Sequence, residues 1–162
     1  MRKLMLTAAI AAIAGQGHAL SCLRPDAIET YQRLAAAPES YFVLKGTLTF
    51  DESALPPSVG SNDTIAPDPI PGSFVGTGLT QGGFDADYVS EVLLQVQCAG
   101  PWCGSAQSGV EAVWFVPFSD PPATLQADPC GSMTFYDPAP ETVAMLESCM
   151  RGETCTPVAF DE

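Results

Sequence analysis

The chain has 162 residues, of which 46% are hydrophobic and 15% charged, and its formal net charge is −13. This composition can bury a core, and the length fits one domain. The acidic balance repels phosphate backbones, so we expect no nucleic-acid partner. The 15 prolines and 14 glycines favour turns and short strands over long helices.

Residues 1–19 have the pattern of a bacterial-type signal peptide. Arg2 and Lys3 precede an apolar stretch over 4–14, and small residues lead up to a predicted cleavage after Ala19. The stretch is too short to span a bilayer. Cleavage would remove two of the 6 basic residues and change the net charge from −13 to −15. We therefore expect a periplasmic or secreted protein with no stable membrane insertion after cleavage.

Histidine is absent from the predicted mature chain. The single histidine, His18, lies inside the predicted leader, so residues 20–162 contain none. Ser-His-Asp and Cys-His catalysis are therefore excluded, as is a zinc site with histidine ligands. We expect a protein that is not an enzyme and has no cofactor, and a carboxylate-dependent enzyme remains the alternative.

Residues 25–37 are predicted to form a helix that covers the core. Ile28, Tyr31 and Leu34 lie on one face at helical spacing. A single apolar stripe is typical of a helix with one buried face. Pro38 is expected to end the helix.

Residues 40–50 give the clearest strand pattern. Alternate positions are large and apolar, namely Phe42, Leu44, Leu48 and Phe50. Gly46 interrupts this face, which predicts a β-bulge or a sharp coil in a curved sheet. The proline-rich residues 51–72 are then expected to form a long, flexible loop.

The rest of the chain predicts short strands and a closing helix. We expect strands at 73–80, 88–98, 109–118, 123–127 and 132–136, and a helix at 138–150. Short strands with a helix at each end predict a single, mainly β domain over 20–162. The expected fold is a small OB-like antiparallel barrel stabilised by disulfides, with a β-sandwich as the alternative.

The 6 cysteines all follow the predicted leader, at Cys22, Cys98, Cys103, Cys130, Cys149 and Cys155. An even number in an exported chain indicates disulfides rather than a zinc site, although the sequence allows many connectivities. Glycine turns inside 98–103 and 149–155 favour two local bridges. Those two bridges would leave Cys22 to pair with Cys130. Acylation of Cys22 is the competing possibility.

Three short segments resemble the netrin-like group, which includes the tissue inhibitors of metalloproteinases. They are Cys22 followed by a helix, the strand Tyr41–Gly46, and Asp128-Pro129-Cys130-Gly131 after the last barrel strand. The resemblance covers the layout of residues 20–136. It implies an exported OB-fold barrel whose N-terminal cysteine region is stapled to a later strand. The pattern Trp102-Cys103-Gly104 is also similar to that of exported bacterial proteins, which suggests a bacterial branch of this group.

The chain departs from the metalloproteinase inhibitors at its predicted mature N-terminus. Those inhibitors begin with Cys-x-Cys, whose first amine and carbonyl chelate the protease zinc. Here Leu20 stands two positions before Cys22. The resemblance therefore leaves inhibition of an exported enzyme as an alternative function, and does not assign it.

The leading expectation is an exported, non-enzymatic binding or structural module for an unidentified protein or small ligand. Trp102 is the candidate ligand contact because it lies in a cysteine-bounded turn and can be exposed. Packing against a disulfide explains Trp102 equally well. Trp114 lies in an apolar strand and is expected in the core.

Overall fold

A computed structural model describes residues 21–59 and 66–157 of the protein. The predicted leader at 1–19 and its cleavage point lie outside the described residues. Within the described residues, neither helix has the length and apolar sequence needed to cross a membrane.

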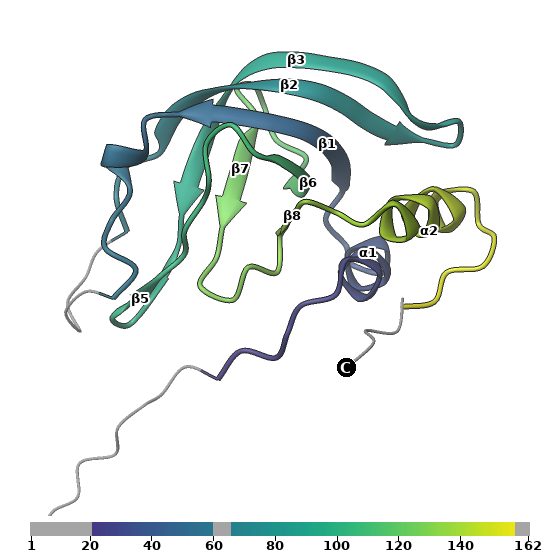
Figure 1. The fold of residues 1–162 in the computed structure, drawn as a ribbon, viewed down its shortest axis with the longest axis horizontal. Coiled ribbons are helices and arrows are strands. Elements are labelled where there is room, and N and C mark those ends of the chain that lie inside the picture. The colour runs from purple at the N-terminus through teal and green to yellow at the C-terminus, as the bar shows by residue number, and fades with distance from the viewer. Residues whose placement is uncertain (1–20, 60–65, 158–162) are drawn as a thin grey trace, which may run out of the picture.

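The described residues form a strongly curled sheet with two helices beside it (Figure 1). The helices are α1 (Ala27–Ala35) and α2 (Pro140–Met150), and a short 3-10 helix, η1, spans Glu52–Ala54. The strands are β1 (Tyr41–Phe50), β2 (Ile70–Thr80), β3 (Gly83–Val96), β4 (Cys98–Ala99), β5 (Trp102–Cys103), β6 (Glu111–Pro117), β7 (Thr124–Ala127) and β8 (Thr134–Tyr136). The helices predicted at 25–37 and 138–150 are thereby confirmed.

The strand order of the large sheet is β7-β3-β2-β1-β6-β8, and β4 and β5 form a separate hairpin. β1, β2 and β3 form an antiparallel meander, and β6 pairs antiparallel with the other edge of β1. β7 returns to pair with β3, and this one pair is parallel. The result is a partly open OB-like barrel with a helix near each end of the chain. The predicted fold class is confirmed, and the β-sandwich alternative is wrong.

β6 is apolar on both faces because both faces are buried. Trp114 points into the barrel interior with Leu44, whereas its neighbour Val113 belongs to a second core cluster with Ile28 of α1 and Leu146 of α2. β6 also has a strand on each edge, β1 and β8. A strand covered in this way reads as a nearly continuous apolar run. The prediction that Trp114 lies in the core is confirmed.

The predicted proline-rich loop at 51–72 is shorter than expected, because β2 already begins at Ile70. Pro71 is compatible with this strand because β1, the neighbour on that side, ends at Phe50, which pairs with Gly72. The 3-10 helix η1 forms the start of the loop, and residues 60–65 lie outside the described residues. The flexibility of the loop stays a prediction.

Of the two alternatives predicted at Gly46, the β-bulge is wrong, and the sharp coil in a curved sheet agrees with the structure. β1 pairs in unbroken register there, with Gly46 opposite Gly76. A Cβ atom on Gly46 would lie 2.6 Å from the Cα of Gly76 and would overlap the carbonyl oxygen of Val75. Gly46 therefore allows two strands to approach closely in the curled sheet. The register shift lies further along β2, between Gly78 and Leu79.

Three disulfides join Cys22 to Cys130, Cys98 to Cys103, and Cys149 to Cys155. This is the predicted connectivity. All described cysteines are paired, so neither a thiolate zinc site nor acylation of Cys22 is compatible with the structure. Three disulfides indicate an oxidising compartment.

Candidate functional site

Trp102, the ligand contact predicted from the sequence, lies in the small β4–β5 hairpin closed by the Cys98–Cys103 bridge. It is half-buried and forms an isolated β-bridge with Val59. The Cys103 N–H, beside it, donates to the Ser58 carbonyl at 3.1 Å. The hairpin is thus held against the segment that follows η1. The role of Trp102 as a ligand contact stays a prediction.

The open side of the barrel contains a hollow of about 420 Å³ that the sequence did not indicate. Residues from β1, β3 and the β6–β7 loop line it, namely Phe42, Tyr88, Ser90, Phe118, Ser119, Pro121 and Ala123. We call this hollow the barrel mouth. None of these lining residues is charged, which makes the barrel mouth suited to an apolar group.

Aromatic side chains form the wall and rim of the barrel mouth. The ring of Tyr88 lies 6.0 Å from the ring of Phe42 and 5.9 Å from that of Phe74, which is fully buried. Phe118, in contrast, is 76% exposed. The aromatic side chains of the barrel mouth therefore extend from the buried core at Phe74 to the solvent-exposed rim at Phe118.

The barrel mouth exists because β7 covers only a small part of β3. β7 pairs with Leu93–Val96, the last residues of that strand. The ladder starts where the Leu93 N–H donates to the Ala123 carbonyl at 2.9 Å. Immediately before Ala123, Pro121 and Pro122 have no N–H donor and cannot extend the pairing. The first part of β3 is therefore left without a neighbour on this edge.

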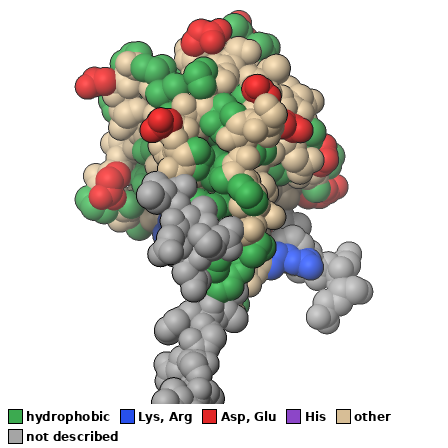
Figure 2. All heavy atoms as spheres, turned by 90° about the vertical axis from the view of Figure 1, so that its left-hand side faces the viewer, with side chains coloured by type: hydrophobic (Ala, Val, Ile, Leu, Met, Phe, Trp, Pro, Cys, Tyr) green, Lys and Arg blue, Asp and Glu red, His purple; other side chains and the backbone are tan. Residues whose placement is uncertain are grey.

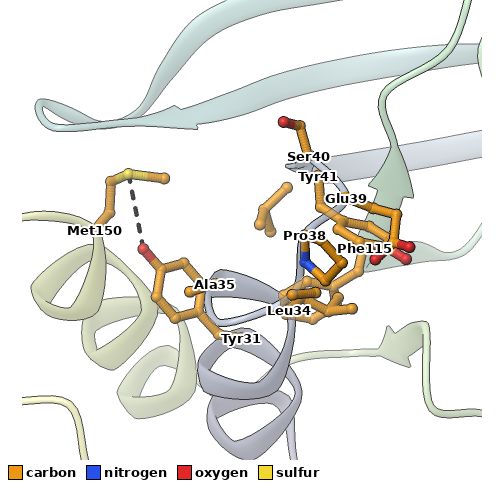
Figure 3. Close-up of a pocket in the computed structure, with 11 residues that line it drawn as sticks. Tyr31, Leu34, Ala35, Pro38, Glu39, Ser40, Tyr41, Phe115 and Met150 are labelled. Atoms are coloured by element: carbon orange, nitrogen blue, oxygen red, sulfur yellow. Dashed lines mark hydrogen bonds between the residues drawn. The ribbon is translucent and has the colours of Figure 1, made fainter.

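A second hollow, of about 310 Å³, lies between α1, the start of β1 and the end of α2 (Figure 3). The Tyr31 hydroxyl donates to the Met150 sulfur at 3.9 Å, and burial raises the pKa of Tyr31. Glu39 is the one carboxylate among its lining residues. The barrel mouth contains none, so neither hollow presents the paired carboxylates that a glycosidase-like mechanism requires.

The carboxylates of Asp26, which is buried, and Asp128, which is half-buried, accept hydrogen bonds from backbone N–H groups. Asp26 caps α1, where its carboxylate accepts from the N–H groups of Ile28 and Glu29 at 2.8 Å. Asp128 accepts from backbone N–H groups of the following loop, including that of Cys130 at 2.9 Å. These contacts satisfy the carboxylates and assign them structural roles.

The acidic side chains are dispersed on the face that Figure 2 shows, where they alternate with apolar and neutral side chains. Within the described residues, no group of three or more His, Cys, Asp or Glu side chains is placed to hold a metal ion. The acidic surface thus has no concentrated cation site in this part of the chain.

No protein-family model, curated protein or solved structure matches this chain. An OB-like fold by itself does not assign a function, since such folds carry many unrelated sites. The function therefore has to be inferred from the barrel mouth and its surroundings.

Proposed function

We propose that the protein is a periplasmic or secreted binding module, not an enzyme, and that its barrel mouth receives an apolar or aromatic group of the ligand. The observation that carries this proposal is the uncharged hollow between Phe42, Tyr88 and the exposed Phe118. An aromatic side chain left in solvent beside an apolar hollow is typical of a recognition site.

The non-enzymatic part of the proposal is supported by the residue inventory. Residues 20–162 lack histidine, and the carboxylates Asp26 and Asp128 already bind backbone N–H groups. The OB-like barrel and the Cys22–Cys130 bridge also support membership of an exported bacterial branch of the netrin-like group, which we retain as a proposal.

The direct test is binding of a neutral apolar dye, N-phenyl-1-naphthylamine, to the oxidised protein without its predicted leader. A neutral probe avoids repulsion by the acidic surface. We expect saturable fluorescence enhancement that Phe118→Ser weakens about tenfold, because that variant removes much of the apolar contact at the rim. Val59→Ser, at another exposed apolar position, is the matched control and should bind normally. Equal dye binding by both variants would place the dye elsewhere and contradict the proposal.

The second candidate function is inhibition of an exported enzyme. It is favoured by one observation beyond the resemblance: the segment before α1 is exposed and is tied to the 128–132 loop by the Cys22–Cys130 bridge, with Leu23 90% exposed. A tethered, exposed segment can enter an active-site cleft. Inhibition of an exported metallopeptidase that is lost in Leu23→Ser would support this function. Absence of inhibition across a panel of exported peptidases would rule it out for that class.

A further inference from the structure

We propose that the ligand of the barrel mouth is an extended segment of a partner protein, in which cationic and apolar residues alternate. The segment would add as a strand to the free edge of β3 and place one apolar side chain in the barrel mouth. This inference rests on the proposed binding function and specifies the partner.

The free edge of β3 is defined by the direction of its amides. In β3 alternate residues direct their N–H and C=O groups toward the same edge. The Leu93 N–H points to β7, so the corresponding groups of Val89 and Glu91 point the same way, beyond the end of β7. In the described part of the chain these two N–H groups have no hydrogen-bond partner. The Glu91 carbonyl accepts from the Ser90 hydroxyl at 3.0 Å, which leaves the Val89 carbonyl and both N–H groups for an added strand.

The free edge and the barrel mouth are adjacent. Tyr88 and Ser90 of β3 line the hollow together with Phe118 and Ala123 of the β6–β7 loop. A strand paired with Val89 and Glu91 would therefore pass beside the hollow. Its side chains would alternate between the hollow and the outer face of the sheet. Main-chain pairing would then supply affinity, and the side chain in the hollow would supply selectivity, as in other cases of β-strand addition.

The acidic residues on the outer face of β3 favour a partner segment with positive charge. Asp87 and Glu91 are exposed there and flank Val89, which is 74% exposed. The nearest cation in the same row of the sheet is Lys45, two strands away, which pairs with Glu111 at 3.6 Å. Lysine or arginine on the outer positions of an added strand would complement these carboxylates.

The same carboxylates disfavour a second copy of this chain as the occupant. Antiparallel pairing of two β3 edges centred on Val89 would place Asp87 of one copy opposite Glu91 of the other. Like charges directly opposite each other destabilise a strand pair. Acidic residues on a free edge are a common protection against self-association.

The experiment uses a short synthetic peptide in which lysine alternates with valine around a central phenylalanine, and a glutamate version as control. Calorimetry should detect binding of the lysine peptide only. Amide hydrogen exchange at Val89 and Glu91 should slow on binding. Val89→Pro removes the outward N–H and should weaken binding about tenfold, whereas Val89→Thr keeps it and should bind normally. Thermal unfolding of Val89→Pro verifies that this variant is folded.

The outcomes separate this inference from the function on which it rests. If the dye binds and Phe118→Ser weakens its binding, but neither peptide slows exchange at Val89 and Glu91, strand addition is wrong and the binding module stands. If neither dye nor peptide binds, both proposals fail. Slower exchange at these amides with rising protein concentration alone would identify a second copy as the occupant and overturn the inference.

Discussion

Strands β6 and β3 differ in how completely the fold covers them. β6 has a strand on each edge and a core cluster on each face. The first half of β3 has only β2 as a neighbour, and its outer face is exposed. The contrast is visible in sequence, since 112–116 is entirely apolar whereas 87–91 contains the polar residues Asp87, Ser90 and Glu91. We therefore expect stability to be concentrated around β6, and we place the proposed binding at the unpaired edge of β3.

The largest expected effect concerns the long-range disulfide between Cys22 and Cys130. Cys22–Cys130 closes a separation of 108 residues, whereas Cys98–Cys103 closes only 5. In the chain-entropy model, replacing both cysteines by serine should cost about 4–5 kcal/mol for the long bridge and about 2 kcal/mol for the short one. Urea unfolding of the two double variants measures this difference. Equal losses would show that strain or unfolded-state structure, and not loop closure, sets the contributions.

The close approach of β1 and β2 is tested by a pair of glycine variants. Gly46→Ala places a Cβ against the backbone of β2, so the strands must separate, and we expect a loss of about 1–3 kcal/mol. At Gly78 the nearest atoms to an added Cβ lie 3.7 Å away, an ordinary contact. Gly78→Ala should therefore be nearly neutral. Similar melting temperatures for the two variants would contradict a role for Gly46 in the curl of the sheet.

Local patterns in the sequence predicted the elements and bridges that depend on local chemistry. The apolar stripe with Pro38 after it located α1, and glycine turns within 98–103 and 149–155 identified the two short disulfides. Of the bulge and the sharp coil expected at Gly46, the bulge is wrong, because an interrupted apolar alternation does not distinguish an extra residue from a close approach of strands. The start of β2 was missed because Pro71 is acceptable only where β1 has ended, which is a tertiary fact.

The barrel mouth could not be predicted in the same way. Its open edge depends on how far β7 pairs with β3, and that parallel pairing joins segments about 30 residues apart. Tyr88 and Phe42 meet only because their strands curl toward each other. Phe118 did carry a weak signal, an aromatic residue followed by Ser-Asp-Pro-Pro at the start of a loop. Trp102 was the more conspicuous aromatic residue in the sequence.

A smaller effect is expected at alkaline pH from Tyr136, which lies on β8, the strand that pairs with one edge of β6. Burial raises the pKa of Tyr136, outweighing the hydrogen bond that its hydroxyl accepts from the Gln107 N–H at 2.9 Å. With a folded pKa above the unfolded value near 10, the contribution to stability is complete below about pH 10 and is lost as the pH rises through the folded pKa. Tyr136→Phe should flatten this decline at a cost of about 1 kcal/mol at neutral pH. Urea unfolding at several pH values gives both quantities, and an unchanged alkaline slope would assign it to another group.

The smallest effect on stability should come from Phe118, at the rim of the open side. Its side chain is 76% exposed, so Phe118→Ser removes little buried apolar area and should change the free energy of unfolding by less than about 0.5 kcal/mol. The same variant should lose most of its affinity for the neutral dye. This separation of stability from binding is what distinguishes a recognition residue from a core residue. If Phe118→Ser instead lowers the free energy of unfolding by more than about 1 kcal/mol, Phe118 belongs to the folding core. The open side of the barrel would then contribute to stability as β6 does, and the contrast between the two regions would fail.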